Sequence, residues 1–306
     1  MNLKRYNKLV LGGAQLGFNY VPHRSNLYKK NNEIKKIFNL GKKYGINKID
    51  TAQAYGKSET NIGLFKKKLS NNIFIVTKLN LKNYNKFNID LEEYVMNQVS
   101  LSLKKLKSKS IDVLMIHQFS DLKKYGINLI FILKKLVKLG FIKEIGISVY
   151  SPKELKYSLR FSEIKNIQIP FNIVDTRWLN NALVSIIKKR RIKIFARSLF
   201  LKGLLLNQSH VDFKGKKIYK KINNKLNEYI KKFYRDNRID ICLSFANSFN
   251  WIKYLVVGFN SKEEFEEILN NFNKPQFKKS EIDLISRDMK KIIDNEKILM
   301  PNLWKN

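Results

Sequence analysis

The stretch KIDTAQAYGKSETNIGLFKKKLSNNIFIVTK, residues 48–78, decides the fold of this chain. It opens on an apolar run that predicts a strand and closes on IFIVTK, which predicts a second strand. Between the two, Glu59 to Leu69 carries apolar residues at helical spacing. A strand, a helix and a further strand in this order indicate a βαβ unit, whose two strands lie parallel in one sheet.

The same alternation runs along the chain and predicts eight such pairs. The predicted strands are Leu9 to Gly12, Lys48 to Thr51, Ile73 to Lys78, Ile111 to His117, Ile145 to Val149, Gln168 to Asn172, Lys193 to Arg197 and Tyr254 to Gly258. The predicted helices are Glu33 to Tyr44, Glu59 to Leu69, Leu91 to Lys107, Leu129 to Leu139, Pro152 to Phe161, Asn181 to Arg190, Asp236 to Ser248 and Ser261 to Asn271. Eight units favour a closed (β/α)8 TIM barrel over an open sheet, and no linker divides residues 1–306, so we expect a single domain.

Two helical segments remain outside this scheme. Lys216 to Phe233 falls between strands seven and eight, and Glu281 to Asp294 predicts an additional C-terminal helix outside the barrel. Ser58, Ser151 and Ser261 are predicted to cap the helices that follow them.

The charge of the chain is extreme: 60 Lys and Arg against 25 Asp and Glu give a formal +35. Such an excess is typical of proteins that bind nucleic acid or acidic membranes. Here the lysines are spread over nearly every helix, without a basic arm, zinc-finger spacing or aromatic RNA-binding motif. Because Asn and Ile are also abundant, a bias in genome composition explains the charge more simply. We therefore do not expect nucleic acid as a partner, and a polyanion site remains the alternative.

The composition also indicates the cellular compartment of the protein and which cysteine and metal chemistry it can carry out. No apolar run approaches the roughly 18 residues that span a bilayer, and the first residues lead into a strand instead of a signal-peptide core, so we expect a cytoplasmic protein without membrane contact. The single cysteine, Cys242, excludes an internal disulfide, and its apolar setting indicates a core thiol. We expect no metal site.

In a (β/α)8 barrel, the chemistry lies at the C-terminal ends of the strands. Asp50, Lys78 and His117 end strands two, three and four, and Tyr55 follows Asp50 by five residues. Each has an ordinary structural explanation when it is taken alone. Together they suit carbonyl reduction: Tyr55 donates a proton, Lys78 stabilises the phenolate, Asp50 keeps Lys78 charged, and His117 orients the substrate oxygen.

These residues resemble those of the aldo-keto reductase family, and the chain is similar to its bacterial members. IDTAQAYGKSETNIG, VTKLN and IDVLMIHQ resemble the family's stretches around its Asp, Tyr, Lys and His. The similarity continues through GFIKEIGISVYSP, IQIPFNIVDT, FARSLFLKGLLL and VVGFNSKEEFEEIL. The resemblance implies an NAD(P)(H)-dependent oxidoreductase acting on an aldehyde, a ketone or the corresponding alcohol, with Asp50, Tyr55, Lys78 and His117 as its catalytic residues.

The resemblance also implies where the nicotinamide end of the cofactor binds. Gln168, with Ser148 beside it, matches the residues that hold the carboxamide, although Val149 stands where many members have Asn. Gly13, Gln15 and Asp50 line the pocket. Arg197 occupies the position of an aromatic ring that stacks on the nicotinamide in many members, and a salt bridge on the barrel rim is the alternative for it. Ser198 and Phe200 match positions near the pyrophosphate.

After strand eight, the glycine turn at Gly258 leads into a helix whose free N–H groups suit a phosphate. The resemblance assigns Asn260, Ser261 and Glu267 to cofactor binding as well. Members that select the 2′-phosphate of NADP place Lys and Arg here, where this chain has Gly258 and Glu264, although Lys262 can compensate. We expect NADP(H) in preference to NAD(H), from the habit of the family.

The substrate is less well defined by the sequence. Phe18, Tyr20 and Arg24 are candidate substrate contacts, and Arg24, Arg177 and Arg197 indicate an anionic or phosphorylated carbonyl compound. The stretch RSLFLKGLL resembles that of bacterial reductases associated with sugar metabolism, which implies a sugar-derived carbonyl compound. A protein of this family that senses nucleotides without turnover is a second hypothesis for the function, and a polyanion-binding protein is the third.

Overall fold

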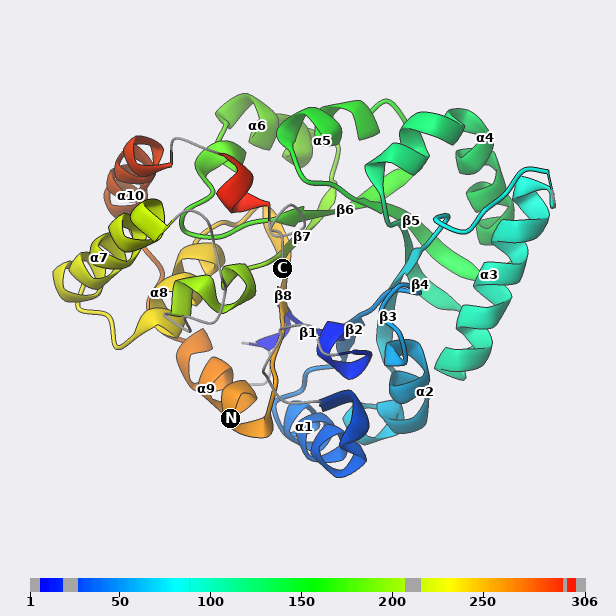
Figure 1. The fold of residues 1–306 in the computed structure, drawn as a ribbon, viewed down its shortest axis with the longest axis horizontal. Coiled ribbons are helices and arrows are strands. Elements are labelled where there is room, and N and C mark those ends of the chain that lie inside the picture. Colours follow the sequence, from blue (N-terminus) through cyan, green and yellow to red (C-terminus); the bar gives the residue numbers. More distant parts are fainter. Residues whose placement is uncertain (1–5, 19–26, 88, 207–215, 294–295, 301–306) are drawn as a thin grey trace.

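Eight parallel strands close into a barrel in the computed structural model (Figure 1), which describes residues 6–18, 27–87, 89–206, 216–293 and 296–300. The strands pair in chain order, and the eighth pairs with the first. Their bounds are β1 Leu9–Gly12, β2 Lys48–Asp50, β3 Phe74–Leu79, β4 Ile111–Ile116, β5 Ile142–Ser148, β6 Ile164–Pro170, β7 Lys193–Arg197 and β8 Ile252–Val257. The predicted (β/α)8 barrel is confirmed.

The helices surround the barrel, as the apolar stripe on each of them requires (Figure 1). In the first helix, for example, Ile34, Ile37 and Phe38 are buried while the lysines face outward. The bounds are α1 Asn31–Lys43, α2 Ser58–Leu69, α3 Leu91–Leu106, α4 Phe119–Lys138, α5 Pro152–Ser158, α6 Asn181–Lys189, α7 Lys216–Lys232, α8 Arg238–Asn247, α9 Lys262–Phe272 and α10 Lys279–Ile292.

The barrel interior is filled by side chains. A buried cluster there consists of Val10, Val76, Val113, Met115, Phe195 and Val256, with Phe74 and Tyr254 packed against it. The barrel is therefore a closed core, and a ligand has room only beyond the strand ends. Cys242 is fully buried in α8, as predicted, and burial raises the pKa of its thiol to about 12.

Several element boundaries differ from the prediction, β6 and α4 by the most, and one predicted cap is wrong. Strand β6 begins at Ile164, four residues before the predicted start, because the alternation IKNIQIP extends it backwards. Helix α4 begins at Phe119 instead of Leu129, since Gly126 takes the left-handed φ of 48° that joins two helical segments. Ser58 does not cap α2: it lies inside the helix and hydrogen-bonds elsewhere, whereas Ser151 and Ser261 do cap α5 and α9.

The two additional helices occupy the predicted places. Helix α7 lies between β7 and β8, and α10 packs beside it outside the barrel. The hydroxyl of Tyr229 in α7 donates to Asp288 in α10 at 3.0 Å, and Lys225 pairs with the same carboxylate at 3.3 Å. These contacts attach the C-terminal helix to the barrel.

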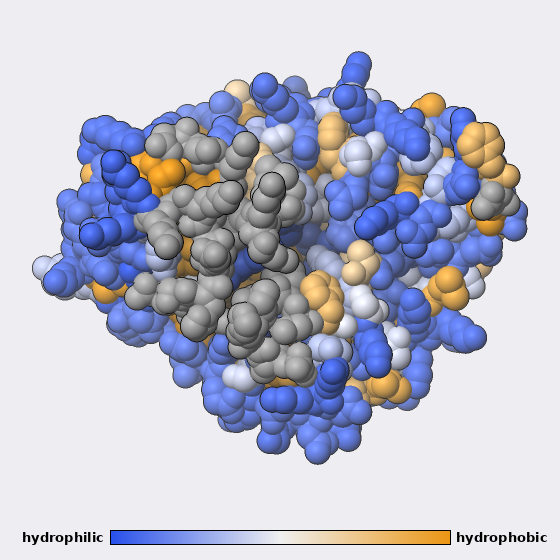
Figure 2. Space-filling view, in the orientation of Figure 1, coloured by the Kyte–Doolittle hydropathy of each residue, from blue (hydrophilic) through white to orange (hydrophobic). Residues whose placement is uncertain are grey.

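The outer surface is strongly hydrophilic on the face that Figure 2 shows, with hydrophobic residues scattered among polar ones. This pattern follows from the lysine-rich outer faces of the helices. Among the described residues, no helix combines the length and the apolar character needed to cross a bilayer.

Candidate active site

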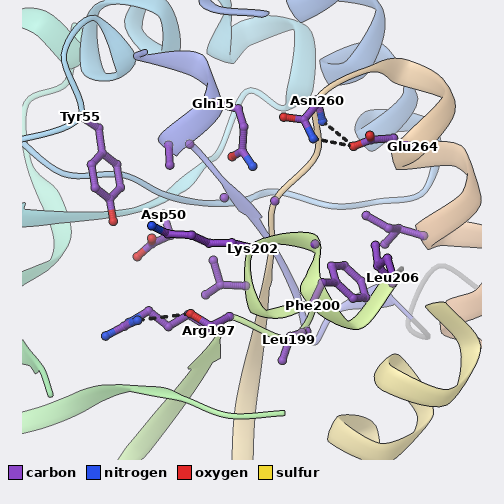
Figure 3. Close-up of a pocket in the computed structure, with 18 of the residues that line it drawn as sticks. Gln15, Asp50, Tyr55, Arg197, Leu199, Phe200, Lys202, Leu206, Asn260 and Glu264 are labelled. Atoms are coloured by element: carbon purple, nitrogen blue, oxygen red, sulfur yellow. Dashed lines mark hydrogen bonds between the residues drawn. The ribbon is translucent and has the colours of Figure 1, made fainter. Parts of the chain in front are cut away.

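A pocket of about 310 Å³ opens at the C-terminal ends of the strands. The predicted site residues that line it are Gly13, Gln15, Asp50, Tyr55, His117, Ser148, Arg197, Ser198, Phe200, Gly258, Asn260 and Glu267. Figure 3 shows Tyr55 and Asp50 on one side of this pocket and Asn260 and Glu264 on another. The structure thus brings residues from most of the predicted strand ends to one cavity.

Asp50 and Lys78 form a buried ion pair under the pocket. The Lys78 ammonium donates to the two Asp50 carboxylate oxygens at 2.9 and 2.7 Å and to the carbonyl of Thr51 at 2.7 Å. Burial lowers the pKa of Lys78, and the charge of Asp50 opposes that effect. Lys78 itself lies behind Asp50, with an exposed fraction of 1%. This is the pairing that the sequence predicted for the two residues.

Gln168 extends the same network from the opposite side of the barrel. Its Nε2 donates to an Asp50 oxygen at 2.8 Å, and its backbone is in register with that of Ser148, which lines the pocket. The side-chain oxygen of Gln168 is buried and has no hydrogen-bond partner in the described part of the chain. A buried amide oxygen without a partner is costly, so a ligand that donates a hydrogen bond to it would be stabilised.

A set of short hydrogen bonds holds the chain around Asp50. The N–H of Gly13 donates to the Asp50 carbonyl at 2.7 Å, and the Ser58 hydroxyl donates to the Gly13 carbonyl at 2.7 Å. The hydroxyls of Thr51 and Ser58 also bond each other at 2.7 Å. Ser58 therefore links the ends of β1 and β2 to the start of α2, which explains why it is not free to cap that helix.

Tyr55 lies in the tight loop between β2 and α2. A Cβ on Gly17 would come within 1.6 Å of the Tyr55 carbonyl, so only glycine permits this close approach. The Tyr55 ring lies 5.8 Å from the His117 ring, edge to face, and 5.1 Å from the Lys78 ammonium. Tyr55 therefore lies close to both His117 and Lys78, as the sequence predicted.

Burial and neighbouring charges act on the Tyr55 hydroxyl. Burial, and then the negative charge of Asp50, raise the pKa of Tyr55 well above its usual value, and Arg197 opposes this shift. Lys78 donates its hydrogen bonds to Asp50 and Thr51, and its ammonium still lies 5.1 Å from the Tyr55 ring, so its predicted role beside the phenolate stays a prediction.

His117 follows β4 and is only partly exposed. Burial lowers its pKa to about 3, and the positive charges of Lys78 and Arg197 act in the same direction. The imidazole is therefore neutral at neutral pH, with one N–H to donate and one nitrogen to accept.

Arg197 ends β7 and lines the pocket. Its guanidinium stacks 4.4 Å above the ring of Tyr150, and it donates to the Ser198 hydroxyl at 3.3 Å. Among the described residues Arg197 pairs with no carboxylate, so they give no support to the alternative of a salt bridge on the rim.

Several predicted site residues lie elsewhere. Ser261 caps α9 through the Glu264 N–H at 3.2 Å and does not line the pocket, and Phe18 does not line it either, although its ring is 6.1 Å from Tyr55. Tyr20 and Arg24 lie outside the described residues. Arg177 is held by Asp175 at 2.7 Å and by Glu296 at 3.0 Å beside a different cavity, so it gives no support to an anionic substrate.

The largest group of lining residues that sequence reasoning missed comes from the segment after β7. These additional lining residues are Gly12, Ala14, Tyr150, Leu199, Lys202, Gly203, Leu206, Ile239, Val256 and Ile268. Glu264, which the sequence placed beside the cofactor, lines the pocket too. Ser198, Leu201, Lys202 and Gly203 all take left-handed backbone conformations, with φ between 48° and 87°. Of these four residues, only glycine is a residue type that predicts a left-handed conformation from the sequence. Ile239 lies in α8, far from any predicted strand end, so its place in the pocket wall depends on how the chain folds.

A model of the Aldo/keto reductase family matches residues 8–287. The chain belongs to the aldo/keto reductase family. It is 28% identical over 167 residues to aldo-keto reductase YhdN of Bacillus subtilis, a match that covers 53% of this chain and only 50% of that relative.

Solved structures share the fold of this family member. The holo form of an aldo-keto reductase from Bacillus halodurans superposes with a TM-score of 0.71 at 20% identity, over 93% of this chain and 91% of that one. An aldo/keto reductase from Klebsiella pneumoniae in complex with NADP and acetate superposes with a TM-score of 0.66 at 14% identity, over 92% and 90% of the two chains.

Proposed function

We propose that this protein reduces an aldehyde or ketone with NAD(P)H, or oxidises the corresponding alcohol in the reverse direction. The observation that carries the proposal is the buried Asp50–Lys78 pair directly beside Tyr55 and His117, at one end of a pocket. When bound, a nicotinamide cofactor would supply the hydride for the carbonyl carbon. The residues of this chain have to bind the reactants, exclude water and provide the proton for the carbonyl oxygen.

The pocket fits a nicotinamide nucleotide. Gln168 is fully buried and does not line the pocket itself; we assign its unpartnered oxygen, behind the pocket wall at Asp50 and Ser148, as the acceptor for the carboxamide. Gly258 leaves room at the wall, because a Cβ there would come within 2.7 Å of the Gln15 amide. We assign the nicotinamide end to Asp50, Ser148 and Gln168, and the phosphates to the segment after β7 that includes Ser198 and Phe200. The NADP complex of the Klebsiella pneumoniae neighbour supports the same class of cofactor.

Tyr55 is assigned as the proton donor. Its raised pKa keeps the hydroxyl protonated at neutral pH, and the charge of Arg197 limits the cost of forming the phenolate. The neutral His117 donates a hydrogen bond that orients the substrate oxygen. Asp50 and Lys78 act as a fixed, neutralised pair that holds this end of the pocket dry and rigid.

The substrate is proposed to be an anionic or sugar-derived carbonyl compound. The support comes from Arg197, whose guanidinium lies in the pocket wall against Tyr150 and is available for a carboxylate or phosphate. A panel in which neutral aldehydes outperform carboxylated and phosphorylated ones would contradict this assignment. The preference for NADP(H) over NAD(H) stays a prediction from the sequence.

The test is a titration of nicotinamide fluorescence with NADPH and NADH, followed by a panel of carbonyl substrates. The proposal expects nucleotide binding and turnover of at least one carbonyl class. Tight binding with negligible turnover across the panel would favour a nucleotide-sensing protein instead. Micromolar binding of DNA or RNA that weakens steeply with salt, without nucleotide turnover, would favour the polyanion-binding alternative.

A further inference from the structure

Tyr150 and Arg197 form a stacked pair in the wall of the pocket. The Arg197 guanidinium lies 4.4 Å from the centre of the Tyr150 ring, and both side chains line the pocket. Arg197 ends β7, whereas Tyr150 follows the end of β5, so the pair bridges two strands that are separated by β6. Figure 3 shows Arg197 on the side of the pocket where Tyr55 and Asp50 lie. The pair therefore belongs to the catalytic end of the pocket.

The backbone of Tyr150 is fixed by the start of α5. Its N–H donates to the Glu154 carboxylate at 2.6 Å, and the Ser151 hydroxyl accepts from the Glu154 N–H at 3.3 Å. These two bonds tie the turn after β5 to the first turn of the helix. The ring of Tyr150 is therefore carried by a part of the chain that has little freedom to move.

The Arg197 guanidinium is held on one face and keeps donors for a ligand. Besides the Tyr150 ring, it contacts the Ser198 hydroxyl at 3.3 Å and the Val149 carbonyl at 3.5 Å. A guanidinium has five N–H donors, and these two contacts use at most two of them. No carboxylate of the described residues pairs with Arg197. The described part of the pocket wall thus presents a cation whose plane is fixed by an aromatic ring.

The charge of Arg197 also reaches the catalytic groups. It opposes the rise in the pKa of Tyr55 that burial and Asp50 cause, and it adds to the lowering of the pKa of His117 that burial causes. An anion bound to Arg197 would therefore lie close to the carbonyl group that Tyr55 protonates. A planar guanidinium binds a carboxylate or phosphate through two parallel hydrogen bonds, which requires that its plane keeps one orientation. Stacking on an aromatic face supplies that orientation.

We infer that Tyr150 is a positioning residue that determines the preference for anionic substrates, because its ring holds the Arg197 guanidinium in the pocket wall. The inference deepens the proposed function and rests on it, since it presupposes carbonyl reduction at Tyr55. The ring of Tyr150 acts here, and its hydroxyl is not required. Lys202 also lines the pocket and is unchanged in every variant below, so its charge is common to all of them.

The experiment compares the kcat and KM of the best carboxylated or phosphorylated carbonyl compound of the panel with those of its uncharged methyl ester or dephosphorylated form. Tyr150→Leu removes the ring, and Tyr150→Phe keeps it. Tyr157→Leu is the matched control, because Arg160 stacks on the Tyr157 ring at 5.2 Å and neither residue lines the pocket. Thermal unfolding of each protein shows that the variants are folded.

Tyr150→Leu is expected to raise the KM of the anionic compound about fivefold to tenfold, while kcat changes by less than about twofold and the KM of the neutral compound is unchanged. Tyr150→Phe and Tyr157→Leu are expected to keep the wild-type ratio of the two KM values. In an Arg197→Met background, Tyr150→Leu has no further effect on this ratio, because both changes act through the same guanidinium.

Three results would overturn this inference alone: an unchanged ratio of the two KM values in Tyr150→Leu, a change in Tyr150→Phe as large as in Tyr150→Leu, or additive effects in the double variant. A wild type that reduces only neutral carbonyl compounds would overturn it together with the anionic substrate. Turnover of no carbonyl compound would overturn the proposed function as well.

Discussion

The two ends of the pocket are built in opposite ways. At the Tyr55 end, Asp50 and Lys78 are 4% and 1% exposed, and their hydrogen bonds join residues 28 and 118 positions apart in the sequence. At the α9 end, Glu264 is partly exposed and bonds Asn260, only four residues away. The hydrogen bonds of the first end therefore join distant strands of the barrel, whereas those of Glu264 with Asn260 lie within the turn and first part of α9.

The two ends of the pocket should therefore respond differently to substitutions. A buried network is rigid and intolerant of change, because each polar group relies on the others. A local, half-exposed contact is tolerant, because water can replace a lost partner. We therefore expect changes at the Tyr55 end to affect stability and turnover together, and changes at the α9 end to cost less stability.

The largest effect is expected for Lys78→Met. This substitution leaves the Asp50 carboxylate buried without its cation, which lowers the free energy of unfolding by about 3–5 kcal/mol. Urea denaturation measures the loss. The double variant Lys78→Met with Asp50→Leu recovers most of it, because no uncompensated charge remains. Glu264→Gln, the matched change at the α9 end, costs less than about 0.5 kcal/mol. Equal losses of unfolding free energy in Lys78→Met and Glu264→Gln would contradict the proposed difference between the two ends of the pocket.

Gln168→Leu is expected to have the next largest effect. The substitution removes the acceptor assigned to the carboxamide, so both NADH and NADPH bind about tenfold more weakly while their ratio is unchanged. Fluorescence titration with both nucleotides measures this. A change in the ratio would mean that Gln168 does not act at the nicotinamide, which the two forms have in common.

His117 gives a smaller effect that depends on pH. Its pKa is about 3 in the folded chain and near 6.5 when unfolded, so its neutral form stabilises the fold fully above pH 6.5 and progressively less as the pH falls towards 3. Between pH 7 and pH 5, the wild type therefore loses about 1–2 kcal/mol more stability than His117→Gln. Urea denaturation at the two pH values checks this, and parallel losses in both proteins would show that His117 titrates normally.

The sequence predicted the features that depend on local patterns. Eight strands, the caps at Ser151 and Ser261, and the placement of Asp50, Lys78 and His117 at strand ends all follow from periodicity and short-range spacing. Local patterns also explain two wrong boundaries, the start of β6 and the start of α4. The pattern of IKNIQIP and that of the segment before Gly126 are each compatible with either a loop or a regular element.

The features that the sequence could not supply depend on closure of the barrel. Arg177 and Arg197 look alike as sequence, yet Asp175 and Glu296 hold the first away from the pocket while the second lines it. Ser58 has the sequence of a cap, but its hydroxyl is taken by Gly13, 45 residues earlier. Ile239 and Lys202 likewise line the pocket only because of the path that the chain takes after β7.

The central claim is that the buried Asp50–Lys78 pair and His117 serve Tyr55 as a proton donor, and Tyr55→Phe tests it most directly. The variant keeps the ring and loses only the hydroxyl, so we predict that turnover of NAD(P)H with a carbonyl substrate falls by about 10²–10⁴, while the nucleotide dissociation constant changes by less than about twofold. Tyr254→Phe, which removes a hydroxyl near the other end of the barrel interior, is the control and keeps its turnover. Turnover retained in Tyr55→Phe would contradict the account.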